Sequence, residues 1–278
     1  MARRVTELEV LRTERLTPSM VRVVAGGDGL AAFPETPYTD RYVKILFPQP
    51  GVEYPEPLDM DRVHAEYPRE QWPVQRTYTV RSLDHAAGEL VIDFVHHGDA
   101  GIAGPWAAAA GPGEPLRLMG PGGAYAPDPD ADAHLLVGDE SALPAVCAAL
   151  ERIPDGAPVI AVLQVGAPGE ELELPGGTEV PGRTVHWLYR SEAAGDTGST
   201  QVPEFVRGLA LPTGRVHAFV HGEAIAVKEL RRYLTREAGV ARDDLSVSGY
   251  WRRGRDEEGF REYKQAERAQ EEAAAQAG

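Results

Sequence analysis

The sequence has a single cysteine, Cys147, among its 278 residues. One cysteine excludes an internal disulfide, and it cannot hold an iron–sulfur cluster by itself. Cys147 lies in an apolar stretch that is typical of a helix, where a buried and unreactive thiol is the usual outcome. The sequence therefore argues against a protein that works through thiol chemistry.

Long apolar runs and an excess of positive charge are also absent. No run of about eighteen apolar residues occurs, so we expect no membrane span. The first residues, MARRVTELEV, lack the apolar core of a signal peptide, and we therefore expect a cytoplasmic protein. The formal net charge of −15 argues against nucleic acid as a partner. It does not exclude a small anionic substrate, because a local basic pocket can bind one.

The chain does have the length and the apolar content of two globular domains. It has 278 residues, of which 42% are hydrophobic and 26% are charged. The pattern changes at residues 124–133, AYAPDPDADA, which we interpret as a linker rich in proline and aspartate. We therefore predict one domain over residues 1–126 and a second over residues 134–278.

Short strands dominate the first half. We predict strands over 5–11, 19–25, 41–47 and 113–123, a turn at Pro18, and a hairpin over 76–95 that turns at 85–88. On 41–47, Tyr42, Lys44 and Leu46 alternate with Val43, Ile45 and Phe47, so the two sets face opposite sides. Residues 48–74 are rich in proline and acid, which predicts an irregular and mobile surface insert. Many short antiparallel strands with one helix indicate a closed barrel.

The stretch from Arg76 to Trp106 gives the strongest indication of a ligand site. Period-two geometry places Arg76 and Tyr78 on one face of a strand. After the hairpin, a loop with glycine at every third position, 98–104, leads to Pro105 and an alanine run, which predicts a helix with proline at its first position. Such a loop presents free N–H groups at the positive end of the helix dipole. This combination suits a ligand with an aromatic ring and phosphates.

Strands and helices alternate beyond the linker, which indicates a parallel sheet. We predict strands over 134–138, 159–165, 184–189, 215–222 and 245–251, and helices over 144–153, 202–208 and 223–238. Ligands of such sheets bind beyond the carboxyl ends of the strands. The first of these ends carries the loop GDESALPA, 138–145, which is not the usual dinucleotide fingerprint. The last residues, 256–278, have acid early and alanine throughout, which predicts a C-terminal helix.

Taken in order, these motifs resemble those of the siderophore-interacting proteins, FAD-containing ferric-siderophore reductases related to the ferredoxin–NADP reductases. The family's Arg-x-Tyr-Thr flavin motif matches Arg76, Tyr78 and Thr79. Its phosphate motif, Gly-x-Ala-Ser-x-Trp after a His-Gly, matches His97, Gly98, Gly101, Ala103 and Trp106, with Gly104 in place of the usual serine. GDESALPA is similar to the family's GDETALPA, and residues 221–234 and 249–254 resemble its late motifs.

The resemblance implies a six-stranded flavin-binding barrel followed by a Rossmann-like domain that binds NAD(P)H. Its cofactors are FAD and NADPH or NADH, and its substrate is a ferric siderophore. Electrons pass from NAD(P)H, or from a reduced ferredoxin, through FAD to Fe(III), so the flavin carries the redox chemistry. The residues implied to bind the cofactors are Arg76, Tyr78, Thr79, Val95, His96, His97, Gly101, Ala103, Gly104, Trp106, Asp139, Glu140, Ser141, Ala142, Glu223, Tyr250 and Trp251.

The neighbouring histidines His96 and His97 do not indicate a metal site. Adjacent residues of a strand point to opposite faces, and no third ligand is apparent. We expect a contact from His97 to the edge of the flavin, with a purely structural histidine as the alternative.

Two cations that related proteins place near the flavin are present as Lys44 and Arg252. A third, the arginine of a Gly-Pro-Arg loop, is Gly122 here. We therefore expect a hydroxamate or mixed siderophore rather than a strongly anionic tris-catecholate. The alternative for Lys44 is a solvated strand lysine, and for Trp251 it is packing against the barrel.

Two other functions remain alternatives at this stage. One is a siderophore-binding protein that does not reduce its ligand. The other is a flavin reductase that delivers electrons to a protein partner, such as a haem protein or a ferredoxin. We expect a monomer in each case.

Overall fold

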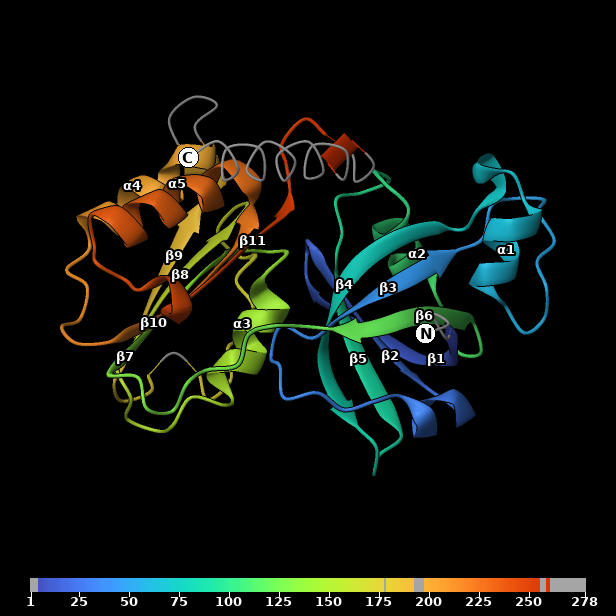
Figure 1. Ribbon diagram of the computed structural model, residues 1–278, viewed down its shortest axis with the longest axis horizontal. Helices are drawn as coiled ribbons and strands as arrows, with labels where there is room; N and C mark the ends of the chain where they lie inside the picture. Colours follow the sequence, from blue (N-terminus) through green and yellow to red (C-terminus); the bar gives the residue numbers. More distant parts are fainter. Residues whose placement is uncertain (1–4, 178, 193–197, 256–258, 261–278) are drawn as a thin grey trace, which may run out of the picture.

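The computed structural model describes residues 5–177, 179–192, 198–255 and 259–260. Two lobes lie side by side, an antiparallel barrel coloured blue to green and a parallel sheet with helices coloured light green to red (Figure 1). The predicted fold, a barrel followed by an α/β domain, is confirmed.

The barrel is closed by six strands in the order β1-β2-β5-β4-β3-β6. The strands are β1 (Val5–Thr17), β2 (Met20–Gly26), β3 (Tyr42–Phe47), β4 (Val74–Asp84), β5 (Glu89–Val95) and β6 (Pro115–Gly122). Val43, Ile45 and Phe47 of β3 lie in the barrel core, as their alternation predicts. β1 does not end at residue 11 as predicted. Its charged second half remains a strand because it pairs with β2, whereas the first half pairs with β6.

The insert between β3 and β4 is not irregular, and that prediction was wrong. It contains the helix α1 (Met60–Glu66) and the short 3₁₀ helix η2 (Arg69–Gln71). The Asp59 side chain caps α1 by accepting hydrogen bonds from the N–H groups of residues 61 and 62. Leu58, Met60 and Val63 form a small core with Leu46 and Met119 on the outer face of the barrel. The insert lies on the side away from the second domain (Figure 1).

The second lobe is a five-stranded parallel sheet in the order β11-β10-β7-β8-β9. Its elements are β7 (Ala133–Asp139), α3 (Leu143–Leu150), β8 (Val159–Val165), β9 (Arg183–Tyr189), η3 (Arg190–Glu192), α4 (Gly198–Gly208), β10 (Val216–Glu223), α5 (Ala224–Arg236), η4 (Arg242–Asp244) and β11 (Leu245–Trp251). Each predicted strand is present. The helix α3 covers the face toward the barrel, while α4 and α5 cover the other face (Figure 1).

Several contacts hold the two lobes together. Arg81 of β4 forms an ion pair with Glu151, which follows α3. The hydroxyl of Ser19, the residue before β2, donates to Glu170 of the second lobe at 2.9 Å. Tyr125 of the linker is 2% exposed, and its ring centroid lies 4.9 Å from those of His217 and Phe219 on β10. The linker therefore packs into the second domain.

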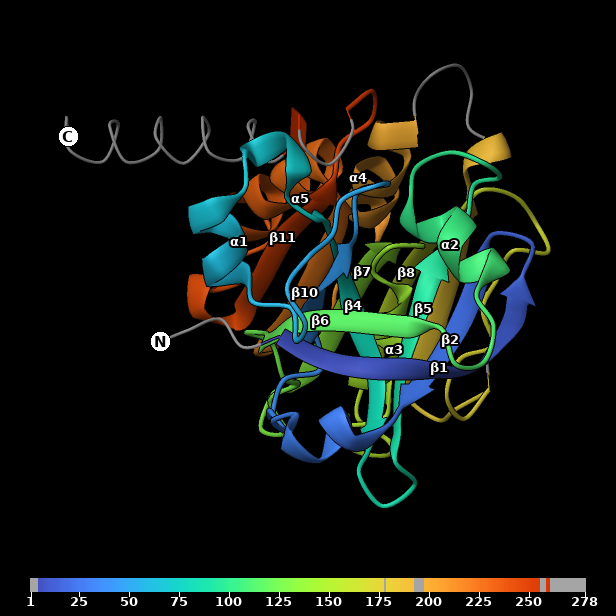
Figure 2. The ribbon, with the colours of Figure 1, turned by 90° about the vertical axis from the view of Figure 1, so that its right-hand side faces the viewer.

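The predicted C-terminal helix falls on residues that lie outside the described part of the chain, apart from residues 259 and 260. Within the described residues, no helix combines the length and the apolar character that crossing a bilayer requires. A second view shows α2 (Ala103–Ala109) covering an end of the barrel (Figure 2).

Candidate functional site

Arg76 and Tyr78 share a face of β4, as their spacing predicts. Arg76 pairs with Ile45 and Tyr78 with Val43, and both partners belong to the barrel core. The Tyr78 ring packs on Phe94 with 4.4 Å between ring centroids. Arg76 Nη1 donates to the carbonyl of the preceding residue at 3.0 Å.

The glycine loop after β5 leads into a helix that begins earlier than predicted. α2 starts at Ala103, so Pro105 is its third residue rather than its first. Gly98 and Gly101 have φ values of 59° and 80°, which favour glycine and turn the chain toward the helix. A Cβ at Gly104 would lie 2.8 Å from the carbonyl oxygen of Val95. The serine found here in the resembling motif would therefore push α2 away from β5.

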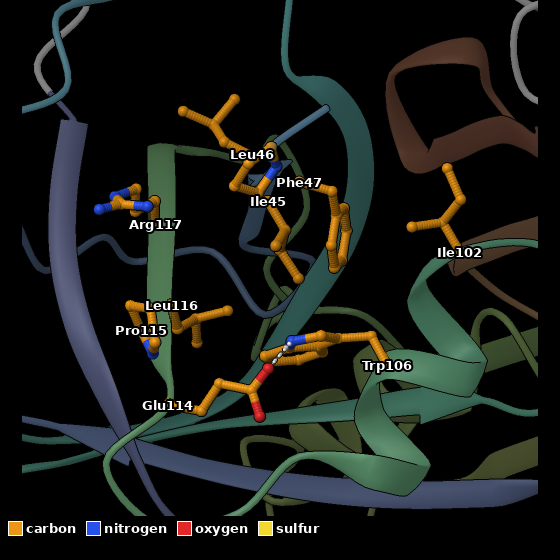
Figure 3. Close-up of a pocket in the computed structure, with 10 residues that line it drawn as sticks. Ile45, Leu46, Phe47, Ile102, Trp106, Glu114, Pro115, Leu116 and Arg117 are labelled. Atoms are coloured by element: carbon orange, nitrogen blue, oxygen red, sulfur yellow. Dashed lines mark hydrogen bonds between the residues drawn. The ribbon is translucent and has the colours of Figure 1, made fainter. Parts of the chain in front are cut away.

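Aromatic side chains connect the strand motif to the helix motif. The Trp106 ring centroid lies 5.6 Å from that of Phe94, which also contacts Tyr78, and 5.6 Å from that of Phe47. Trp106 Nε1 donates to Glu114 at 2.7 Å (Figure 3). A largely apolar cavity of about 310 Å³ opens beside Trp106, between β3, β6 and the start of α2 (Figure 3).

His96 and His97 are not strand residues, because β5 ends at Val95. The argument that they alternate across a strand was therefore wrong. His96 Nδ1 lies 3.2 Å from Arg15 Nη1, on the barrel side. His97 faces the second domain, where burial and the nearby charge of Arg190 lower its pKa. At neutral pH His97 is thus held as the neutral imidazole.

In the second domain, Asp139 is the centre of a hydrogen-bond cluster at the carboxyl end of β7. Its side chain is 4% exposed. Oδ2 accepts from the Glu223 N–H and from Trp251 Nε1, both at 2.8 Å. Oδ1 accepts from the Ser141 N–H at 3.0 Å and from the Ser141 hydroxyl. Four of the predicted site residues, Asp139, Ser141, Glu223 and Trp251, are therefore held together by one carboxylate.

The other predicted residues of this loop are buried, and their contacts fix the shape of the loop. Glu140 is 4% exposed and forms an ion pair with Arg190. Arg190 Nη1 also donates to Gln164 at 3.0 Å. Ala142 is fully buried, and its Cβ would lie 2.8 Å from a Cβ added at Gly138. The Glu223 side chain caps α5 through the N–H groups of residues 225 and 226, at 2.8 and 3.0 Å.

Tyr250 joins the second domain to the flavin motif. Its hydroxyl lies 2.9 Å from Nδ1 of His221, whose Nε2 lies 2.9 Å from the Ser246 hydroxyl. The Thr79 side chain of β4 lies close enough to the Tyr250 hydroxyl to influence its pKa. Burial raises the pKa of the Tyr250 hydroxyl, and the nearby Asp40 carboxylate raises it further. The hydroxyl therefore stays protonated across the physiological range.

Lys44 and Arg252 lie on different domains that meet at this point. Lys44 is two residues from Tyr42 on the outer face of β3, and Tyr42 pairs with Thr79. Arg252 follows the last residue of β11, two positions after Tyr250. Each cation therefore lies two positions along the chain from a tyrosine near the domain junction.

Sequence reasoning did not identify the supporting roles of Arg190, Gln164 and His221, because nothing local marks a side chain that supports another one. Among the described residues, no group of three or more His, Cys, Asp or Glu side chains could hold a metal ion.

The barrel side of the site fits a flavin dinucleotide. Ile102, the N-cap of α2, makes no side-chain hydrogen bond to the helix, which leaves the N–H groups of the first turn to other acceptors. The cavity beside Trp106 is of a size and polarity that suit a heteroaromatic ring. Arg76 provides a cation on the adjoining strand.

Comparisons with known proteins agree with this geometry. Residues 9–125 match the family model of the siderophore-interacting FAD-binding domain, and residues 131–254 match that of the siderophore-interacting protein. An uncharacterized protein of Mycobacterium tuberculosis is 48% identical over 267 residues, which are 92% of this chain and 93% of that protein. Ferric vibriobactin reductase of Vibrio cholerae is 33% identical over 262 residues, 92% of each chain. An NADPH-dependent ferric-chelate reductase of Escherichia coli is 32% identical over 251 residues, 89% of this chain and 93% of the relative.

Solved structures show the same fold. A siderophore utilization protein from T. fusca superposes with a TM-score of 0.76 at 37% identity, covering 91% of this chain and 94% of that one. The ferredoxin reductase of carbazole 1,9a-dioxygenase has a TM-score of 0.63 at 17% identity, over 89% of this chain and 70% of that one, and shares the fold alone.

Proposed function

Because the chain belongs to the siderophore-interacting protein family, we propose that it is an FAD-dependent reductase of ferric siderophores. The observation that carries the proposal is the contact between the Arg76–Thr79 strand motif and Tyr250, which brings a candidate flavin site of the barrel to the carboxyl edge of the parallel sheet. A cofactor placed there would touch both domains. Relatives named as ferric-chelate and ferric vibriobactin reductases support the reaction class.

On the barrel, Arg76 would hold the pyrophosphate of FAD through charge-assisted hydrogen bonds. The N–H groups at the start of α2 would share that task, and Tyr78 and Thr79 would orient the ring system. When bound, FAD would supply the conversion of a two-electron donor into single-electron transfers to Fe(III). His97 and Tyr250 would face the flavin from the side of the second domain, and both are held uncharged.

In the second domain, the loop at residues 138–142 would support the nicotinamide nucleotide. Asp139 and Glu140 are already engaged within the protein, so we assign them to holding the loop rather than to binding phosphate. NADPH is the first donor to test, because the Escherichia coli relative is named for it. A reduced ferredoxin is the alternative donor.

We propose a hydroxamate or mixed siderophore as the substrate. Lys44 and Arg252 provide two cations near the domain junction, and Gly122 provides none. A strongly anionic tris-catecholate complex would therefore lack one of its charge partners here, whereas an uncharged complex needs none.

The test is an anaerobic assay of the purified full chain. Absorbance and release of FAD on heating report the cofactor, and an Fe(II) chelator reports iron reduction with NADPH, NADH or reduced ferredoxin as the donor. Fe(II) formation that depends on the donor and on bound FAD supports the proposal. A protein that binds ferric siderophores without flavin would be a carrier. A flavin that is reduced by NAD(P)H but passes electrons to no ferric siderophore would point to a protein acceptor.

A further inference from the structure

The outer face of the barrel carries an aromatic cover beside the domain junction. Tyr42 on β3 pairs with Thr79 on one side and with Gly122 on the other. A Cβ at Gly122 would lie 2.5 Å from Tyr42 Cζ and 2.6 Å from its hydroxyl oxygen, so the ring lies directly over this glycine. Tyr42 is nevertheless 39% exposed. A side chain at position 122 and the ring of Tyr42 would therefore occupy the same space.

A second tyrosine extends this cover. A Cβ at Gly123 would lie 2.8 Å from Tyr38 Cβ, and Tyr38 is 37% exposed. We call Tyr38 and Tyr42, with the two glycines that they cover, the tyrosine ledge. Asp40 lies under it, where its carboxylate is buried and accepts the N–H groups of residues 124 and 125 at 2.8 and 2.9 Å. The ledge thus combines exposed aromatic surface with a buried negative charge.

The ledge borders the site through the neighbours of Tyr42. Thr79, which pairs with Tyr42, and Tyr42 itself both lie close enough to the Tyr250 hydroxyl to influence its pKa. Lys44 follows two positions later on the same face of β3. A ligand that reached Lys44 from the domain junction would therefore pass over the ring of Tyr42.

We propose that Tyr42 is a specificity-determining residue that makes this site prefer ferric chelates of low net charge over strongly anionic ones. The proposal rests on the function proposed above. The ring offers a flat face for stacking and, by filling the space over Gly122, keeps any charged side chain out of it. An Fe(III) tris-hydroxamate complex is electrically neutral and loses nothing here, whereas a tris-catecholate complex is strongly anionic and lies near the Asp40 carboxylate.

The first measurement is binding, made with gallium(III) complexes that have the charge of the iron complexes and are not reduced. The probes are gallium ferrichrome-type tris-hydroxamate and gallium enterobactin-type tris-catecholate, titrated into the FAD-loaded chain by calorimetry. The variants are Tyr42→Ala, Gly122→Arg and their combination. Gly208→Arg is the matched control, because it adds the same charge at a second-domain glycine with nothing within 4 Å of its Cβ.

Tyr42→Ala should weaken binding of the neutral complex by about threefold to tenfold, which is the affinity that one aromatic contact contributes. The combined variant should bind the anionic complex about fivefold more tightly than wild type does, as expected for one partly exposed ion pair. Gly122→Arg alone should gain less affinity for the anionic complex, because the Tyr42 ring occupies the space that the arginine side chain needs. Gly208→Arg should leave the ratio of the two affinities unchanged. If Tyr42→Ala does not fold, Tyr42→Arg replaces the ring by a cation and should itself shift the ratio toward the anionic complex.

Three results would overturn the role of Tyr42. The first is that Tyr42→Ala changes the affinities for both complexes equally, and the second is that Gly122→Arg alone gives the full gain in affinity for the anionic complex. The third is that the wild type binds neither complex. Iron reduction is measured separately with the Fe(III) complexes. If the gallium complexes bind but no protein, wild type included, forms Fe(II), the proposed reductase function fails, and the specificity assignment is still decided by the binding ratios.

Discussion

Asp139 is the acceptor at the centre of the hydrogen-bond cluster of the second domain, and its replacement should lower the free energy of unfolding. The Asp139 carboxylate accepts two hydrogen bonds on each oxygen and is 4% exposed. Asp139→Asn keeps the shape but turns one oxygen into an NH₂ group, so two buried donors lose their acceptor. Each hydrogen bond to a charged acceptor is worth about 1.5–3 kcal/mol. We therefore expect the free energy of unfolding to fall by about 3–5 kcal/mol.

The assay is urea unfolding followed by far-UV circular dichroism, with the free energies compared at unchanged m-values. Asp243→Asn, at an exposed position, is the matched control and should change the free energy by less than about 0.5 kcal/mol. Trp251→Phe removes one of the four donors. Combined with Asp139→Ala it should show a coupling energy of about 1–2 kcal/mol. A loss below about 1 kcal/mol for Asp139→Asn, or no coupling to Trp251, would refute the reasoning.

Three further outcomes are expected. Arg76→Ala should weaken FAD binding by about tenfold to a hundredfold through loss of a charge-assisted contact, measured by flavin fluorescence on dilution; a folded variant that keeps its flavin contradicts the assignment. Gly222 and Gly156 both have positive φ, 140° and 79°, but only at position 222 would an added Cβ lie 2.5 Å from the Asp139 carboxylate. Gly222→Ala should therefore lower the melting temperature more than Gly156→Ala does, and equal losses would contradict this. Burial lowers the pKa of His134 to about 4, below its value near 6.5 in the unfolded chain, so stability should fall as the pH drops through this window, by about 2 kcal/mol between pH 7 and pH 5, and His134→Leu should remove that part of the pH dependence.

Much of the fold could be predicted because its signals are local. β8 and β11 match the predicted ranges. β8 is a short apolar run between Pro158 and Gly166, which leaves few alternatives. The helix α1 in the insert was missed although Asp59 offers an N-cap signal. Its apolar residues are few and lie among prolines, and its stability comes from packing on Leu46 and Met119, which are distant in sequence.

The candidate site also has parts that the sequence predicts and parts that it does not. The shared face of Arg76 and Tyr78 follows from strand geometry alone. The cluster around Asp139 does not, because its partners lie 84 and 112 residues away along the chain. The place of Tyr42 over Gly122 depends on the register of β3 with β6, which no pattern in either strand reveals. The start of α2 at Ala103 was missed because proline was taken as the first helical residue.

The position of Tyr125 has a consequence for how the protein can come apart. The residue belongs to the linker, yet its ring fills a space in the second domain while its N–H is bound by Asp40 of the barrel side. Loosening either domain removes a partner of the same residue. The two domains should therefore melt as one cooperative unit, and a chain cut between residues 122 and 133 should yield fragments that are each less stable than the intact protein.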